Sequence, residues 1–242
     1  MEPKLQNKSD FSRLLRDYKP SDSVLDLFAK LNGVFLVAPA GSGRNTVINN
    51  LIMTDKYFFI VSDTTRPPRL NNGKMEEDGV AYWFKTEQQV LSGLERGEYL
   101  APALIHSQQV SGIHLFELKR AIDSDKICIT DMDINGYLSV ASFQSKMRAL
   151  FILPPDFDIW MERLKTRGAI SEKEFSSRLY SAIDELSTAL EFKMPMIVNN
   201  DIYSTTEAIH QFAENGTVSQ ENDTVAQNHA NDLIEKLKYA QI

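Results

Sequence analysis

The sequence predicts an α/β fold in which a mostly parallel β-sheet is covered by helices on both faces. Short apolar runs alternate along the chain with segments of helical periodicity, which is typical of such sheets. A glycine-bearing loop follows the first apolar run, and polar side chains follow the later ones. Ligands of open α/β sheets bind beyond the carboxyl ends of the strands, so these polar side chains mark the expected site.

The composition suits one large domain, or one domain with a small insert. The chain has 242 residues, of which 43% are hydrophobic and 24% charged, and its net charge is −7. This acidic balance argues against nucleic acid or an anionic membrane as the main partner, although a few arginines can still bind a nucleotide phosphate. The single cysteine excludes an internal disulfide in this chain. No apolar run approaches the ~18–20 residues that span a bilayer, and residues 1–8 lack the apolar core of a secretory signal, so we expect a cytoplasmic protein.

The first apolar run, Val34–Val37, leads into the glycine-bearing loop, and apolar residues then recur at helical spacing as far as Ile52. A strand, a glycine loop and a helix start form a phosphate cradle, because loop N–H groups and the helix dipole point at one anion. The pattern G-x-x-x-x-G-K-[ST] is met loosely, with Ala38 first and Arg44-Asn45 last. On its own, this stretch also fits an ordinary strand-to-helix turn.

The second apolar run, Tyr57–Val61, predicts a buried strand that ends at Ser62. Two prolines then hold Arg66 and Arg69 three residues apart on a stiff, extended segment. A planar guanidinium binds phosphate through two parallel hydrogen bonds, so this pair would grip a dianion. Taken alone, the segment also fits a solvated basic loop.

The region that follows interrupts the alternation of strands and helices. It consists of a polar stretch (71–78), a strand (80–84), a short helix (87–94) and two strands that we expect to pair (99–105 and 110–113). An inserted subdomain that holds the substrate would give this pattern.

The alternation then resumes towards the C-terminus. We expect strands at 127–130, 149–153 and 196–198, and helices at 134–147, 157–164, 172–192 and 205–212. The first and last of these strands end at Asp131/Asp133 and Asn199/Asn200. We also expect one or two short helices within residues 1–30. Residues 216–242 predict a loosely docked extension, polar at 217–223 and weakly amphipathic afterwards.

Six motifs in order resemble the guanylate kinase family of nucleoside-monophosphate kinases. They are Val61-Ser62-x-Thr64-Thr65-Arg66-x-Pro68-Arg69, Asp78-Gly79-x-x-Tyr82-x-Phe84, Asp131-x-Asp133-x-x-Gly136, Phe151-Ile152-Leu153-Pro154-Pro155, Arg163-Leu164-x-x-Arg167-Gly168 and Val198-Asn199-Asn200-Asp201. One of them alone is weak, whereas six at close to the family's spacing are highly specific. The resemblance covers residues 33–214.

The resemblance implies a P-loop NTPase-type sheet with two functional attachments. These are a mixed α+β insert (63–122) that binds the nucleoside monophosphate and a helical lid (157–178), on a core of residues 33–62 and 123–214. Residues 1–32 and 215–242 would be extensions. The implied reaction is transfer of the γ-phosphoryl group of ATP to GMP or dGMP with Mg²⁺, giving ADP and GDP.

The resemblance also implies the residues of the site. The acceptor phosphate would be bound by Arg66, Arg69 and Tyr82, and the acceptor base by Ser62 and Asp133. The ATP-binding residues would be Pro39, Ala40, Gly41, Ser42, Gly43, Arg44, Asn45, Thr46 and Asn199, the last near the adenine. The catalytic residues would be Arg44, Asp131 and the lid arginines Arg163, Arg167 and Arg178. Asn45 and Asp131 would hold Mg²⁺, through water in the case of Asp131.

The base-binding half departs from the family pattern. The glutamate expected three residues after Glu98 is Ala101, residues 108–112 lack the family's second tyrosine, and the Ser/Thr expected after that segment is missing too. Losing a carboxylate that accepts hydrogen bonds from a base costs about 1.5–3 kcal/mol, which would weaken the preference for guanine. Ala101 would alternatively signal another base, or a different residue reaching in from His106 or Gln108.

The glycine loop departs in one position that bears on catalysis. Arg44 stands where the family has lysine; it keeps the charge, but its planar head needs more room. Phosphoryl transfer depends on aligned charge, so a displaced cation would slow it. Two hypotheses therefore remain: an active kinase, which the retained arginines favour, or a silent module that binds a nucleotide or a phosphorylated partner. In either, we expect Arg66 and Arg69 to face the glycine loop across one cleft.

Overall fold

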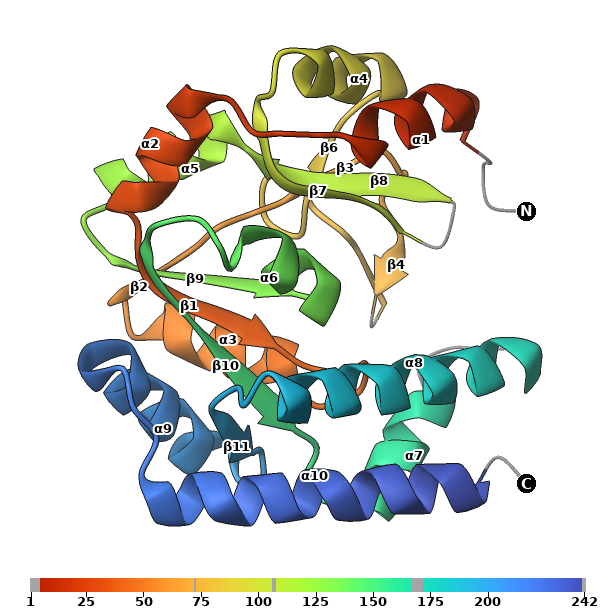
Figure 1. Cartoon of the computed structure of the whole chain (residues 1–242), viewed down its shortest axis with the longest axis vertical. Coiled ribbons are helices and arrows are strands. Elements are labelled where there is room, and N and C mark those ends of the chain that lie inside the picture. Colours follow the sequence, from red (N-terminus) through yellow and green to blue (C-terminus); the bar gives the residue numbers. More distant parts are fainter. Residues whose placement is uncertain (1–4, 72, 106–107, 167–171, 241–242) are drawn as a thin grey trace. The chain divides into compact units, whose positions relative to one another are not determined.

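The structure is a computed structural model that describes residues 5–71, 73–105, 108–166 and 172–240 (Figure 1). The chain divides into two compact units. The first unit contains residues 1–32, 58–128 and 138–146, and the second contains residues 33–57, 129–137 and 147–242. The expected division into core, insert, lid and extensions stays a prediction.

The apolar runs of the sequence form one central sheet. In the described residues it consists of β1 (Asn32–Val37), β2 (Tyr57–Phe59), β9 (Ile127–Met132), β10 (Lys146–Leu153) and β11 (Met196–Val198), in the order β11-β10-β1-β9-β2. Strands β10 and β11 are parallel, with Phe151 opposite Met196 and Leu153 opposite Val198. Strands that are neighbours in space but not in sequence need crossover connections, and helices supply them. The predicted α/β class with a parallel central sheet is confirmed.

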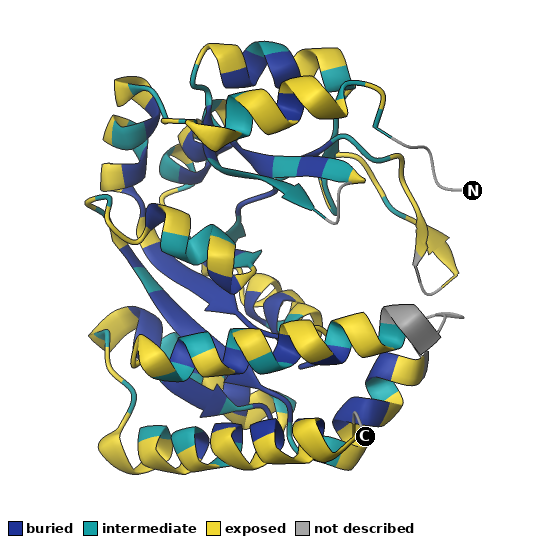
Figure 2. Ribbon diagram, turned by 45° about the vertical axis from the view of Figure 1, so that its right-hand side comes forward, coloured by how far each residue is buried: buried dark blue, intermediate teal, exposed yellow. Residues whose placement is uncertain are grey.

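Helices of the second unit bury the apolar sides of these strands. They are α3 (Arg44–Met53), α7 (Phe157–Thr166), α8 (Glu172–Glu191), α9 (Ile202–Asn215) and α10 (Gln220–Ala240). Helix α3 packs against α9, and α10 packs against α8 and β11. The carboxylate of Asp201 caps α9 by accepting hydrogen bonds from the N–H groups of Tyr203 and Ser204. Figure 2 shows that the strands are buried while the outer faces of the helices are exposed.

The first unit is a smaller α+β assembly. Its mixed sheet has the order β6-β3-β8-β7, and its helices include α1 (Lys8–Arg16), α2 (Asp22–Lys30), α4 (Glu87–Glu95) and α5 (Leu115–Asp123). The strands are β3 (Asp63–Thr64), β6 (Trp83–Phe84), β7 (Tyr99–Ile105) and β8 (Gln109–His114). The predicted pairing of β7 with β8 is confirmed and antiparallel. A separate hairpin joins β4 (Leu70–Asn71) to β5 (Lys74–Met75) within the stretch expected to be polar.

Several predicted elements have different bounds in the structure, and the helix at 134–147 and the strand at 80–84 are much shorter than expected. The helix expected at 134–147 is only α6 (Ile134–Val140), because β10 already begins at Lys146, whose N–H donates to Leu31 O. The strand expected at 80–84 is shortened to β6, because a turn occupies 77–82 and the N–H groups of Val80 and Ala81 both donate to Glu77 O.

The expectation of a loosely docked C-terminal segment is wrong. Helix α10 begins at Gln220 and buries Ala226, Ala230, Leu233, Ile234 and Leu237. The carboxylate of Asp223 also accepts a hydrogen bond of 2.9 Å from the backbone N–H of Met196 in the edge strand β11. Two of these five buried residues are alanines, which is why the amphipathic pattern is weak in the sequence. Among the described residues, no helix is both long and apolar enough to cross a membrane.

Candidate functional site

The glycine loop lies between β1 and α3 in the second unit. Gly41 and Gly43 have φ angles of +83° and +91°, a conformation that side chains with a Cβ rarely adopt. A Cβ on Gly43 would also lie 2.5 Å from Nδ2 of Asn199. Glycine at 43 is therefore required both by the backbone conformation and by the close approach of Asn199. Helix α3 begins at the next residue, so its N-terminal N–H groups face the loop.

A cavity of about 360 Å³ opens beside this loop, within the second unit. Its lining comes from the loop, the first turn of α3, α7, the residues after β11 and the start of α9: Gly41, Gly43, Thr46, Arg163, Asn199, Asn200 and Ile202. Pockets of a few hundred Å³ that combine apolar walls with a few polar groups are typical of small-molecule sites. The cavity therefore brings three of the predicted loop residues together with Asn199 and with Arg163, one of the arginines predicted to belong to the lid.

Two side chains brace the loop from outside it. The indole Nε1 of Trp160 donates to Ala40 O at 2.7 Å, and the amide Nδ2 of Asn199 donates to Ser42 O at 2.9 Å. Trp160 is fully buried on α7 and also packs against Gly41. Its role was not predicted from the sequence, where it belongs to an ordinary amphipathic segment. Trp160 lies seven residues after Leu153, beyond the two prolines that end the strand. This position in the sequence does not indicate a contact with the glycine loop.

Arg44 is held by oxygens at the ends of β1 and β9. Its Nη2 lies 2.9 Å from the carboxylate of Asp131, and its Nη1 donates to Met132 O at 2.9 Å and more weakly to Leu36 O and Ala38 O at 3.3 and 3.4 Å. A guanidinium carries five N–H donors in one plane, whereas a lysine ammonium carries three on one atom. The forked head therefore reaches a set of oxygens that a lysine could not all contact.

Asp133, Arg167 and Arg178 are further predicted site residues in the second unit. Asp133 follows β9, and its Oδ1 accepts a hydrogen bond of 2.6 Å from the N–H of Gly136. Arg178 is partly buried on α8. Arg167 lies outside the described residues. Glu185, also on α8, was not predicted; burial and then the negative charge of Asp133 raise its pKa to about 7, against an opposing effect of Arg44.

Arg66 is the centre of a cluster of charged and aromatic side chains in the first unit. Its guanidinium forms a two-point ion pair with the carboxylate of Glu76, with a distance of 2.8 Å from Nη2 to Oε1. It also lies over the ring of Tyr82, 4.7 Å from the centroid, and near the ring of Phe84 at 5.8 Å. The backbone N–H of Arg69 donates to the same Glu76 carboxylate at 2.9 Å. The structure thus places the guanidinium of Arg66 and the backbone of Arg69 on one carboxylate, with the ring of Tyr82 against Arg66.

Glu76 is a member of this cluster that sequence reasoning missed. The hairpin β4–β5 folds the chain back so that Glu76 meets Arg66, ten residues earlier. The hydrogen bonds from Arg66 hold the pKa of Glu76 below its usual value. The sequence does hold one signal for this contact. Glu76 follows a turn that contains Gly73, and the turn follows Arg66 and Arg69, so a reversal of the chain would bring the carboxylate near the arginines. The two-point ion pair with this carboxylate fixes the orientation of the guanidinium.

Ser62 is held between two strands of the first unit. Its carbonyl accepts a hydrogen bond from Trp83 N at 2.9 Å, and the fully buried Glu117 accepts from the N–H of Val61 and from Nε1 of Trp83. Glu117 was not predicted as a site residue. It fixes the backbone at Val61, directly before Ser62, and the side chain of Trp83, which follows Tyr82.

Ala101 occupies an irregular part of β7. Its φ is +49°, and the register with β8 shifts between Leu100 and Ala103. This conformation is uncommon for a residue with a Cβ. Strand β7 has the sequence Tyr-Leu-Ala-Pro-Ala-Leu-Ile, so the strand itself contains no carboxylate near position 101.

The comparisons with known proteins point to one family. Residues 30–216 match the sequence model of the family described as guanylate kinase. The guanylate kinase of Corynebacterium efficiens is 32% identical over 178 residues, which is 73% of this chain and 91% of that protein. The guanylate kinase of Thermotoga maritima is 31% identical over 204 residues, which is 84% of this chain and 92% of that protein.

A solved structure is similar in fold. The crystal structure of guanylate kinase from Anaplasma phagocytophilum covers 80% of this chain and 90% of its own length, with a TM-score of 0.56. Its sequence identity to this chain is 22%, so the likeness concerns the fold alone.

Proposed function

The chain belongs to the guanylate kinase family, and from this we propose that it is a nucleoside-monophosphate kinase. It transfers the γ-phosphoryl group of ATP to GMP or dGMP and releases ADP with GDP or dGDP. A phosphate oxygen of the acceptor forms the new bond to the γ-phosphorus. The bond from that phosphorus to the β–γ bridging oxygen breaks, and ADP leaves.

The single observation that carries this proposal is the cavity beside the glycine loop. It combines a helix N-terminus and loop N–H groups, which bind phosphate, with the guanidinium of Arg163. Trp160 and Asn199 fix the loop carbonyls, so the cradle exists before ATP enters. A fixed arrangement of donors is what phosphoryl transfer requires, because catalysis there consists mostly of positioning and charge stabilisation. Arg44, Arg163, Arg167 and Arg178 would supply that charge.

On the acceptor side, we assign the phosphate to Arg66, Arg69 and Tyr82, and the base to Ser62 and Asp133. Support comes from the guanidinium of Arg66, which the Glu76 carboxylate and the rings of Tyr82 and Phe84 already hold in one orientation. Less ordering is therefore needed when the acceptor binds. The apolar strand around Ala101 supports weaker discrimination among bases than a carboxylate there would give.

The residues present fit a magnesium ion that enters with ATP. Asp131 offers a partly exposed carboxylate, and Asn45 is exposed in the first turn of α3. Such oxygen atoms suit Mg²⁺, which keeps several of its waters and is bound chiefly by nucleotide phosphates. The ion would neutralise the charge of the phosphates. Because Arg44 already contacts Asp131, contact between this carboxylate and the ion through water is the better fit.

A coupled assay of ADP release tests the proposal directly. The chain, ATP and Mg²⁺ are combined with GMP, dGMP, AMP, CMP or UMP in separate reactions. We expect turnover with GMP and dGMP above the rate without acceptor. A folded sample that turns over no acceptor but still binds ADP would support the second candidate, a silent module that binds a nucleotide or a phosphorylated partner.

A further inference from the structure

The hydroxyl of Tyr18, which precedes the part of the chain that matches the family, closes the edge of the small sheet. It donates to Tyr99 O at 2.7 Å and accepts from Tyr99 N at 2.8 Å. Strand β7 is the last strand of its sheet, so these two backbone groups would otherwise lack a ladder partner. Burial raises the pKa of Tyr18 to about 12, so the hydroxyl keeps the proton that it donates.

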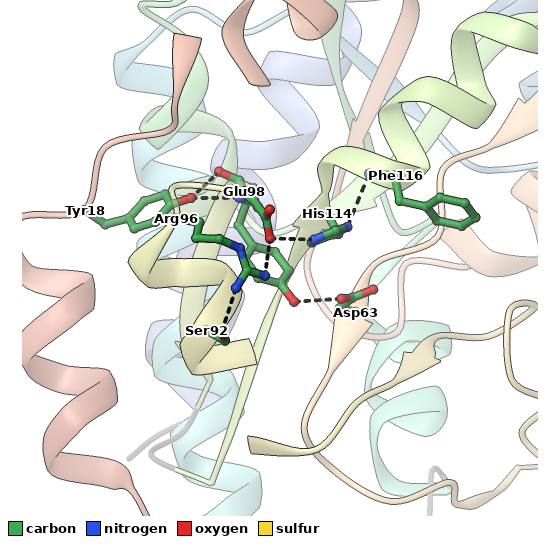
Figure 3. A network of polar contacts seen from close by, with 8 residues as sticks. Tyr18, Asp63, Ser92, Arg96, Glu98, His114 and Phe116 are labelled. Carbon is green, nitrogen blue, oxygen red and sulfur yellow. Dashed lines mark hydrogen bonds and ion pairs between the residues drawn. The ribbon is translucent and has the colours of Figure 1, made fainter. Parts of the chain in front are cut away.

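The side chain of Tyr99 carries this contact across the sheet. Its hydroxyl donates to Oδ2 of Asp63 at 2.7 Å, although β8 lies between β7 and β3. The intervening residue opposite Asp63 is Gly112, and a Cβ there would lie 3.2 Å from Cδ1 of Tyr99. The missing side chain at Gly112 therefore gives the phenol its path over the strand. Figure 3 shows Tyr18 at one end of this network and Asp63 at the other.

Asp63 lies within the acceptor-binding segment. It follows Ser62 directly and precedes Arg66 by three residues. Its carboxylate is buried, and its carbonyl accepts a hydrogen bond of 2.6 Å from Oγ of Ser111. Two residues later, the N–H of Thr65 donates to Val110 O. A shift of Asp63 would therefore move the backbone from which Ser62 and Arg66 project.

The N-terminal segment that carries Tyr18 is firmly packed against the first unit. Phe11 is fully buried in a cluster with residues of α4, β7 and β8. The carboxylate of Glu87 accepts hydrogen bonds from the N–H groups of Gln6 and Asn7, and Ser21 N donates to Gly97 O. The hydroxyl of Tyr18 is thus held in place by contacts on both sides of it in sequence.

We propose that Tyr18 is a positioning residue for the acceptor nucleotide, acting through Tyr99 and Asp63 on the segment that contains Ser62 and Arg66. This inference rests on the proposed kinase function, because it assigns a role to that segment. The family match begins at residue 30, so Tyr18 lies in the N-terminal part of the chain that the match does not cover. The contact from Tyr18 through Tyr99 to Asp63 strengthens binding of the acceptor and leaves the affinity for ATP unchanged.

The test compares Tyr18→Phe with the matched control Tyr239→Phe, which removes a hydroxyl from a side chain that is 77% exposed on α10. We expect Tyr18→Phe to raise KM for GMP about tenfold, as the loss of one hydrogen-bonded group allows. KM for ATP should stay within about twofold, and the control should change neither. A merely structural role would lower the melting temperature or kcat without separating the two KM values.

Tyr99→Phe provides a second route to the same result if Tyr18→Phe folds poorly. Both variants act on one path, so the double variant should raise KM for GMP less than the product of the single effects. An unchanged KM for GMP in both single variants, or an equal rise in both KM values, would overturn the inference.

A hydrogen-exchange measurement separates this inference from the proposed function. If the unaltered chain turns over no nucleoside monophosphate, that assay refutes the proposed function and leaves the positioning path to be tested by hydrogen exchange. Tyr18→Phe should still accelerate exchange of backbone amides at 62–66 and leave those at 33–53 unchanged. Unaltered exchange at 62–66 would refute the positioning path whether or not the chain is a kinase.

Discussion

Replacing Arg66 by alanine removes the guanidinium that Glu76, Tyr82 and Phe84 hold in one orientation in the first unit. If this head binds the acceptor phosphate, the variant loses two charge-assisted hydrogen bonds at once. Each is worth about 1.5–3 kcal/mol, so the loss is about 3 kcal/mol or more, or at least roughly a hundredfold in affinity for GMP. Affinity for ADP should stay within about twofold, because the cavity beside the glycine loop contains no part of Arg66.

The same substitution also leaves the Glu76 carboxylate without its partner. The Glu76 side chain is 12% exposed and keeps the hydrogen bond from the N–H of Arg69, so losing the guanidinium costs about 1–3 kcal/mol of stability. A loss of binding through poor folding must therefore be separated from a loss of the phosphate contact. Arg66→Met with Glu76→Gln serves this purpose, because it replaces both charges and keeps similar volumes. We expect this double variant to recover most of the melting temperature and none of the GMP affinity.

The assay is titration calorimetry of GMP and of ADP, in separate experiments, on the unaltered chain and both variants. Thermal unfolding of the same samples measures stability. The reasoning is refuted if the well-folded double variant binds GMP as tightly as the unaltered chain. It is also refuted if both variants lose ADP and GMP affinity equally.

Three further predictions concern the second unit. Glu185→Gln should remove a pH dependence: burial raises the pKa of Glu185 from 4.5 to about 7, so the folded chain favours the protonated acid and loses stability as the pH rises across that interval. The free energy of unfolding, measured with denaturant, should fall between pH 4 and pH 8 by about 3 kcal/mol more in the unaltered chain than in the variant. Equal changes with pH in the two proteins would contradict the assignment. Asp131→Asn should tighten ADP binding in EDTA, because Arg44 loses a carboxylate partner and is freed for the phosphates, whereas weaker binding in EDTA would argue against that competition. Leu233→Ala should destabilise the chain by about 2–5 kcal/mol because α10 is docked, while Tyr239→Ala on the same helix should change stability by less than about 0.5 kcal/mol; equal small effects would contradict the docking.

Much of the central sheet could be predicted because its signals are local. The strands are continuous apolar runs bounded by prolines or polar residues, and Gly41 and Gly43 predict the loop after β1. The two prolines after Arg66 likewise identified a stiff segment bearing two arginines. These features depend only on neighbours in the sequence, so periodicity and turn chemistry suffice to find them.

The partners of those residues could not be predicted, because they come from distant parts of the chain. Glu76 reaches Arg66 only after a hairpin reverses the chain, and Trp160 reaches Ala40 across 120 residues. The docking of α10 was missed for a different reason. Small side chains such as Ala226 and Ala230 pack closely against neighbouring helices, but they contribute little to an amphipathic pattern.

Binding of a bisubstrate analogue tests most directly whether the donor and acceptor residues serve one reaction. In this compound, adenosine and guanosine are joined through five phosphates, so it can occupy both half-sites only if they accept one continuous chain. We predict one molecule bound per chain, at least about a hundredfold more tightly than ADP or GMP alone, and a loss of that advantage in the Arg66→Met/Glu76→Gln variant. Binding no tighter than that of ADP alone, with no response to the double substitution, would contradict the account.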